Sequence, residues 1–141
     1  MSDISEFKCV MVLDADQPAG VRANTAAILG ITLGAKFPAL VGPDAPDGDG
    51  TPHPGIIMTP VPILKGDQAG LRALRDKLAD PKFAPVWCAD FSDTAQCCQT
   101  YPVYLDHARQ TPEADYHYLG LLLCGEKKLV NKLTGSLPLL R

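Results

Sequence analysis

The stretch "KCVMVLDADQPAGVRANTAAILGITLGAK" (residues 8–36) decides the fold class of this chain. Residues 8–16 form a near-continuous apolar run that ends at two carboxylates, which predicts a central strand covered on both faces. Residues 17–36 repeat Ala, Ile and Leu at helical spacing, and small residues such as Ala26 and Gly30 would let that helix lie close to a sheet. A strand that leads into a crossover helix predicts a layered α/β fold.

The segments beyond residue 36 continue this alternation. Strands are predicted over 56–66 and 84–91, and residues 111–125 are predicted to run from a turn into a strand. Helices are predicted over 67–80, 93 to about 109, and 126–135. In the helix over 67–80, leucines recur at i, i+3 and i+7 and Asp67 takes the N-cap position. Prolines in and beside 56–66 cannot donate to a sheet ladder, which favours an edge strand. With no repeat and no second hydrophobic unit, we predict a single domain over residues 1–141.

The chain closes on "VNKLTGSLPLLR" (residues 130–141), an apolar end where chain termini are usually polar. We expect Gly135 to stop the preceding helix in a left-handed conformation. Leu137, Leu139 and Leu140 would then return to the body of the protein as an extended tail, and Pro138 suits an edge position.

Composition narrows the class of protein. Of 141 residues, 46% are hydrophobic and 21% charged, an ordinary globular mixture, and the net charge is −3. This acidity weighs against a nucleic-acid partner, because phosphate neutralisation needs a basic face. No apolar run approaches the ~20 residues that span a bilayer, so no membrane association is predicted. The acidic, polar start does not resemble a secretory signal.

The cysteines and the absence of several known motifs narrow the class of protein further. Five cysteines without a CxxC pair indicate reduced, mostly buried thiols in a cytoplasmic protein. Nucleotide-binding, serine-hydrolase and zinc-protease motifs are absent from the sequence, so no cofactor is predicted.

Two strand ends carry the candidate polar residues. Asp14 and Asp16 end the first strand, and Asn24 lies early in the following helix. In open α/β sheets ligands bind outside the carboxyl ends of strands, and paired carboxylates suit acid–base chemistry. The alternative is that these side chains are solvated loop and capping residues.

Asp93, Thr94 and Gln96 follow a later strand at the same type of junction. Their spacing is typical of a capping box, a role compatible with lining a pocket. Cys97 and Cys98 would fall in the first turns of the same helix, where packing is favoured over reactivity.

Other polar groups fit structural roles. Residues 44–53 hold three aspartates and a histidine, but a calcium loop that started at Asp44 would need Glu where Gly55 stands, so a solvated turn is favoured. His107 and His117 lack metal-ligand spacing, so no metal is predicted. One basic cluster near the chain end is the best available anion or RNA contact, although complementation of the helix dipole is the favoured explanation: Lys127, Lys128, Lys132 and Arg141.

Two segments resemble the archaeal and eukaryotic (type II) peptidyl-tRNA hydrolases. "KCVMVLDAD" is similar to that family's first strand, and "NKLTGSLPLL" is similar to its closing sequence. Val21 and Ala23 stand where the family's loop carries lysines, and Ala27 stands where its helix carries Gln.

Over nearly its full length the chain resembles a bacterial family known only as domain of unknown function number two thousand, thought to share that hydrolase fold. The matching features are "DADQPAGVRANTAAIL", "LVGPD" with a "DGDG" tip, "FSDTAQ" and "YLGLLLCGEKKLVNKLTGSLPLLR". The resemblance implies a three-layer α/β/α domain with a mixed sheet of about four strands.

We therefore hypothesise an uncharacterised protein with a remodelled version of the hydrolase pocket, acting as a hydrolase on a small polar substrate. The catalytic candidates are Asp14, Asp16, Asn24 and Asp93, and the ligand-binding candidates are Gly20, Thr94, Gln96, Lys132 and Thr134. The alternative is a non-enzymatic binding module, or one that forms a homodimer through its leucine tail. A third reading is retained peptidyl-tRNA hydrolase activity.

Overall fold

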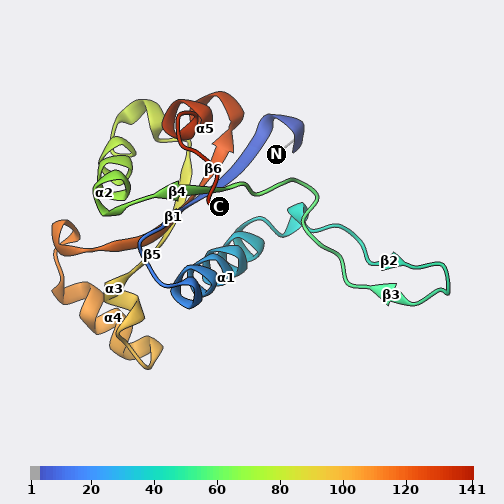
Figure 1. Cartoon of the computed structure of the whole chain (residues 1–141), viewed down its shortest axis with the longest axis horizontal. Helices are drawn as coiled ribbons and strands as arrows, with labels where there is room; N and C mark the ends of the chain where they lie inside the picture. Colours follow the sequence, from blue (N-terminus) through green and yellow to red (C-terminus); the bar gives the residue numbers. More distant parts are fainter. Residues whose placement is uncertain (1–3) are drawn as a thin grey trace.

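The computed structural model, which describes residues 4–141, is an α/β domain built on a four-stranded mixed sheet (Figure 1). The strands of this sheet lie in the order β4-β1-β6-β5. They are β1 (Phe7–Asp14), β4 (Ile63–Gly66), β5 (Trp87–Ser92) and β6 (Tyr118–Glu126). β4 pairs parallel to β1, whereas β6 pairs antiparallel to both β1 and β5. The carboxyl ends of β4, β1 and β5 therefore share one edge of the sheet, where β6 begins.

Helices cover both faces of the sheet, as the apolar runs of the central strands require. α1 (Ala19–Lys36) packs on one face, and α2 (Gln68–Lys77) and α5 (Lys127–Thr134) pack on the other (Figure 1). Side chains of β1 alternate between the two cores: Val10 and Val12 lie on the α2 and α5 side, and Met11 and Leu13 on the α1 side. The three-layer α/β/α arrangement with a mixed sheet is thus confirmed.

One glycine of β6 lets α1 approach the sheet closely. A Cβ at Gly120 would lie 2.7 Å from Thr25 Cγ2 and 2.8 Å from Leu13 Cδ2, both of them buried. The contact between helix and sheet is therefore made through a small residue of the strand, in addition to the small residues expected in the helix.

The predicted helix from residue 93 to about 109 is wrong in one respect, because it is two helices. α3 (Asp93–Gln96) ends before Cys97, and α4 (Tyr101–Gln110) begins after Thr100, whose hydroxyl accepts from Val103 N at 3.4 Å. Pro102 explains the break, since inside a continuous helix its ring would clash with the preceding turn. In the first turn of a new helix proline is tolerated.

The leucine tail returns to the body as expected. Lys65 N donates to Pro138 O at 2.8 Å, Leu140 N donates to Ile63 O at 2.9 Å, and Leu64 and Leu139 form an antiparallel bridge. β4 is the edge of the four-stranded sheet, as predicted, but it covers only the end of the strand predicted over 56–66. The tail lies along its outer side. Gly135 does not adopt the expected left-handed conformation: its φ of −62° is right-handed, and its N–H donates to Asn131 O at 2.8 Å.

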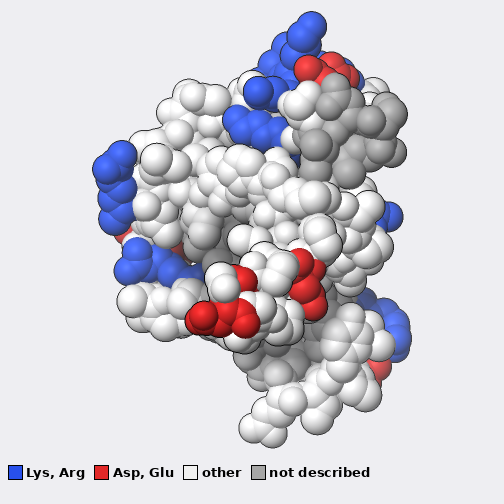
Figure 2. Space-filling model, turned by 90° about the vertical axis from the view of Figure 1, so that its right-hand side faces the viewer, with Lys and Arg blue, Asp and Glu red and all other residues white. Residues whose placement is uncertain are grey.

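Residues 43–57 form an arm that projects from the body (Figure 1). It carries the short strands β2 (Ala45–Pro46) and β3 (Pro52–His53). Elsewhere in residues 4–141 lie the 3₁₀ turns η1 (Ile4–Glu6), η2 (Pro38–Leu40), η3 (Pro81–Phe83) and η4 (Glu113–Asp115). Figure 2 faces the tip of the arm and shows acidic side chains there. The carboxylate of Asp47 accepts from Asp49 N and Thr51 N and pairs with His53 at 2.9 Å, as in a self-contained turn.

The helices of residues 4–141 include none with the length and apolarity that a membrane crossing requires.

Candidate functional site

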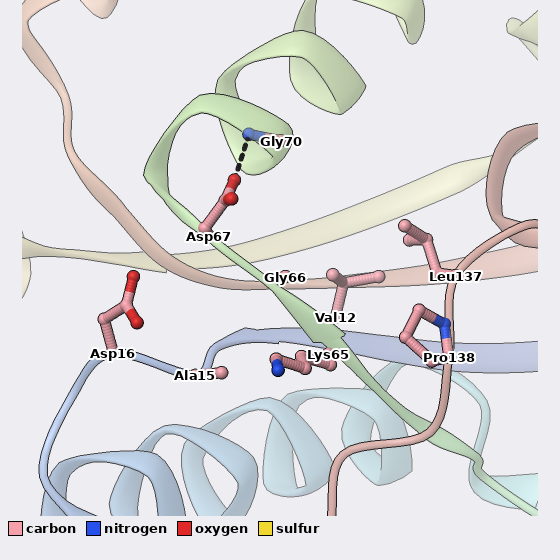
Figure 3. Close-up of a pocket in the computed structure, with 9 residues that line it drawn as sticks. All are labelled: Val12, Ala15, Asp16, Lys65, Gly66, Asp67, Gly70, Leu137 and Pro138. Carbon is pink, nitrogen blue, oxygen red and sulfur yellow. Dashed lines mark hydrogen bonds between the residues drawn. The ribbon is translucent and has the colours of Figure 1, made fainter.

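A pocket lies where β1 and β4 end and the tail crosses them (Figure 3). Its volume of about 480 Å³ falls in the range of small-molecule sites. We call it the Asp16 pocket, and it is lined by Val12, Ala15, Asp16, Lys65, Gly66, Asp67, Gly70, Leu137 and Pro138. Figure 3 shows the Asp16 and Asp67 carboxylates at one end and Leu137 and Pro138 at the other. The pocket thus joins a polar end to an apolar one.

The two carboxylates that end the first predicted strand have different environments. Asp14 is 1% exposed and accepts hydrogen bonds from Asp16 N at 3.0 Å and from Gln17 Nε2 at 3.1 Å. Asp14 therefore holds the turn after β1, since a buried carboxylate needs such partners. Asp16 is exposed, and no described residue forms a hydrogen bond or ion pair with its carboxylate. The turn leaves Asp16 available to a ligand.

β4 supplies the other charged groups of the pocket. Asp67 follows β4 directly and caps α2, accepting from Gly70 N at 2.7 Å. Lys65 is exposed, and its backbone N–H is bound by the tail. Ala15 N donates to Gly66 O at 3.0 Å and ties the two strand ends together. The pocket is therefore lined by two aspartates and one lysine, and hydrogen bonds hold the backbone of β4 to β1 and to the tail.

This set of groups has a defined chemistry. Carboxylates bind ammonium and guanidinium groups by charge-assisted hydrogen bonds, and a lysine binds a carboxylate or phosphate. An unpaired carboxylate such as that of Asp16 can also take a proton from water in a hydrolysis. From the sequence, Asp16 was predicted as a site residue, Asp67 was given only a capping role, and Lys65 was given no role. Lys65 and Asp67 lie near Asp16 because β4 pairs parallel to β1, and no local sequence pattern indicates that pairing.

The candidates near residue 93 lie at the same edge of the sheet but outside the Asp16 pocket. Leu13 of β1 and Phe91 of β5 both pair with Gly120, so β6 separates the two strand ends. Instead of capping its helix, Asp93 pairs with His117 of the segment before β6: its Oδ1 accepts from His117 N and its Oδ2 contacts Nδ1, both at 3.0 Å. Partial burial raises the pKa of Asp93, but the hydrogen bonds from His117 outweigh it, so the pKa lies below its ordinary value.

The remaining candidates are dispersed. Thr94 and Gln96 both belong to α3; Thr94 is buried and Gln96 is exposed. Gly20 and Asn24 are exposed on α1 and do not line the Asp16 pocket. The structure therefore gathers these four residues into no common site with Asp16.

The two candidates on α5 also lie outside the pocket. Thr134 is buried and donates to Val130 O at 2.9 Å. Lys132 faces a separate groove beside Lys77, Asp80 and Lys82. Of the nine predicted site residues, Asp16 alone lines the pocket, and Asp14 supports its turn.

Beyond β5 the structure brings together three side chains that sequence spacing did not connect. The donor atoms of Cys97, Cys98 and His107 all lie within 4.8 Å of one another. His107 reaches the cysteines because the chain breaks between α3 and α4. The sequence does not predict that His107 contacts the two cysteines, because Pro102 indicates a break in the helix but not the angle between α3 and α4.

Comparisons with known proteins identify the family of this chain and a solved structure with a similar fold. Residues 7–141 match the model of the family described as protein of unknown function (DUF2000), so the chain belongs to that family. A solved structure from Agrobacterium tumefaciens strain C58, also a protein of unknown function, is 17% identical with a TM-score of 0.85. The similarity covers 95% of this chain and 97% of that one and, at this identity, shows the fold alone. No curated protein matches the chain.

Proposed function

We propose that the chain binds a small polar molecule in the Asp16 pocket, and that this ligand carries a positively charged amine. The observation that carries the proposal is the Asp16 carboxylate, which is exposed at the end of the pocket beside Asp67 and has no partner among the described residues. A carboxylate held on an ordered turn without a partner favours a cation, because charge-assisted hydrogen bonds are the strongest it can form.

The rest of the pocket supports a ligand with two kinds of charge. Lys65 would pair with a carboxylate of the ligand, and Leu137 and Pro138 offer an apolar wall for an aliphatic chain. Amino acids and their derivatives combine these three features. They are the ligand class that we favour.

Hydrolysis is a second candidate function, favoured by the same unpaired carboxylate. Asp16 would act as general base towards water while Asp67 and Lys65 orient the substrate. The tail "NKLTGSLPLL" and the first strand support a relation to the type II peptidyl-tRNA hydrolase fold, whereas Val21 and Ala23 leave out its loop lysines. Retained peptidyl-tRNA activity would be tested with diacetyl-lysyl-tRNA, and absence of cleavage at high protein concentration would exclude it.

A titration followed by NMR tests the binding proposal. The probe is L-lysine, with butylamine and butyrate as compounds that carry one charge each. We expect L-lysine to shift the amide signals of residues 15–16, 65–70 and 137–138, butylamine to shift the Asp16 end, and butyrate to act weakly.

Asp16→Asn should weaken the binding of L-lysine at least about tenfold. Asp115→Asn is the matched control, because it removes an exposed carboxylate on η4, outside the pocket. Equal binding by the two variants, or shifts elsewhere in the protein, would refute the proposal. If an ester or amide of lysine is turned over, Asp16→Ala must abolish the turnover for the hydrolase reading to stand.

A further inference from the structure

Three metal-binding side chains converge at the joint between α3 and α4. Cys97 and Cys98 occupy the break, and His107 lies on the second turn of α4. Cys97 Sγ lies 3.5 Å and Cys98 Sγ 3.6 Å from His107 Nδ1, and the two sulfurs are 4.0 Å apart. We call these residues the Cys97–His107 cluster.

These distances match the edges of a tetrahedral zinc site. With Zn–S near 2.3 Å and Zn–N near 2.0–2.1 Å, tetrahedral angles place two sulfurs about 3.8 Å apart and a sulfur about 3.6 Å from a nitrogen. The observed triangle, 4.0, 3.5 and 3.6 Å, deviates from these edges by about 0.2 Å or less. A zinc ion would need little movement of the three side chains.

A carbonyl oxygen at the same point is a second, independent observation. Thr94 O lies 3.0 Å from His107 Nδ1, 3.2 Å from Cys98 Sγ and 3.6 Å from Cys97 Sγ. The role of His107 Nδ1 depends on the tautomer of the imidazole: with the proton on Nε2, Nδ1 is free to bind a metal ion. Thr94 O then lies beside all three ligand atoms as an additional oxygen donor to the same ion.

We propose that the Cys97–His107 cluster binds one Zn²⁺ ion through Cys97 Sγ, Cys98 Sγ and His107 Nδ1. Two thiolates balance the charge of the ion, and sulfur and imidazole ligands favour zinc over magnesium or calcium. The fourth position falls to Thr94 O or to water. Each thiol releases one proton to solvent as its sulfur–metal bond forms, so binding is stronger at higher pH.

The ion would give α4 a fixed place on the domain. α4 buries no side chain, and Tyr101, Val103 and Leu105 are 70%, 52% and 47% exposed. Besides the contacts of His107, a few hydrogen bonds hold it, such as that from Tyr116 Oη to Ala108 O at 3.3 Å. A bond from His107 to the same ion as Cys97 and Cys98 would therefore order the helix.

Binding is tested with the reduced, metal-free full chain and zinc alone. Competition with a chromogenic chelator should give one zinc per chain, and cobalt should give thiolate charge-transfer absorption. Cys97→Ser, Cys98→Ser and His107→Asn should each weaken zinc binding at least about tenfold. Cys88→Ala is the matched control, since Cys88 lies on β5 outside the cluster and should leave binding unchanged. Circular dichroism verifies that each variant is folded.

Hydrogen exchange gives a second readout. Zinc should slow amide exchange in α4 of the wild type but not of Cys97→Ser, while exchange in α2 stays the same. The proposal is overturned if the reduced wild type takes up no zinc at about 10 μM, or if the three variants bind as the wild type does. These experiments do not involve the Asp16 pocket, so their failure leaves the proposed ligand binding untouched.

Discussion

Helices α2 and α4 are both ten residues long, yet the protein holds them in different ways. α2 buries Leu71 and Leu74 against the sheet, whereas α4 buries no side chain. Both begin at a capping side chain, with a 2.7 Å bond at Asp67 and a 3.4 Å bond at Thr100. Most helical stability in proteins comes from packing an apolar face, so α2 is part of the core and α4 depends on polar contacts.

Each helix borders one of the two proposed sites, and this difference bears on how the sites work. The Asp16 pocket is built on strand ends and on a helix anchored in the core, so its groups are in place before a ligand arrives. His107 sits on the loosely held helix, so the ion would complete the local structure that binds it. One site is expected to be preformed, and the other to be coupled to local ordering.

The largest difference should come from removing one leucine of each helix. Leu71 is fully buried, and Leu71→Ala should lower the free energy of unfolding by about 3 kcal/mol through lost burial and a cavity. Leu105 is 47% exposed, and Leu105→Ala should change the free energy of unfolding by less than about 0.5 kcal/mol. Urea denaturation of the two variants measures both values. Similar losses would mean that α4 is packed as firmly as α2.

The same contrast explains what could be predicted from the sequence. The stripe of Leu71, Leu74 and Leu78 predicts α2, because the spacing of apolar residues in an amphipathic helix shows which side is buried. Asp67, directly before the helix, predicts its N-cap. The Asp16 end of β1 was predictable for a similar reason, since an apolar run that stops at carboxylates marks a strand end. Local patterns were sufficient wherever the core determines the structure.

Features that depend on pairing or on a turn angle were not predictable. Lys65 and Asp67 join Asp16 only because β4 runs parallel to β1, which no single segment encodes. Pro102 was in the sequence, yet a continuous helix was expected through it, and His107 was judged to lack metal-ligand spacing because it is distant in sequence from Cys97. The left-handed conformation expected at Gly135 failed because a right-handed turn already satisfies its N–H.

The second prediction concerns the cap of α2. Asp67→Ala removes the acceptor for Gly70 N and should cost about 1 kcal/mol of stability. It should also weaken amine binding in the Asp16 pocket. Asp76→Ala on the exposed side of α2 breaks only a surface pair with Arg72 and should cost less than about 0.5 kcal/mol. Thermal unfolding measures the loss of stability, and the NMR titration measures the loss of amine binding. If Asp67→Ala lowers the stability no more than Asp76→Ala does, the cap does not stabilise α2 as described.

Thr100→Ala should have a smaller global effect and a clear local one. The bond from Val103 N is long, so we expect a loss of about 0.5 kcal/mol or less. Because α4 lacks buried side chains, its amides should exchange faster in this variant while those of α2 do not change. Ser92→Ala, at the start of α3 where the side chain makes no capping bond, is the control for loss of a hydroxyl group. Equal exchange of α4 in Thr100→Ala and the wild type would show that other contacts hold the helix.

The smallest expected effect concerns the Asp93–His117 pair, which ties the start of α3 to the segment before β6. The pKa of Asp93 is lower in the folded chain than in the unfolded one, because the hydrogen bonds from His117 outweigh partial burial. Its contribution is therefore complete above the unfolded value, about 3.9, and is lost as pH falls through the folded value. Both side chains are largely exposed, so solvent screening limits the contribution to a few tenths of a kcal/mol.

Asp93→Asn tests this contribution because the amide oxygen can still accept from His117 N while the charge is gone. We expect the stability difference from wild type, measured by urea denaturation, to be largest near neutral pH and to shrink towards pH 3. Asp115→Asn, which removes an exposed carboxylate on η4, is the control. A difference that grows on acidification would mean that the hydrogen bonds of the Asp93 carboxylate do not stabilise its charged form. The 3.0 Å bond from Asp93 N to His117 O would then be the stabilising contact between Asp93 and His117.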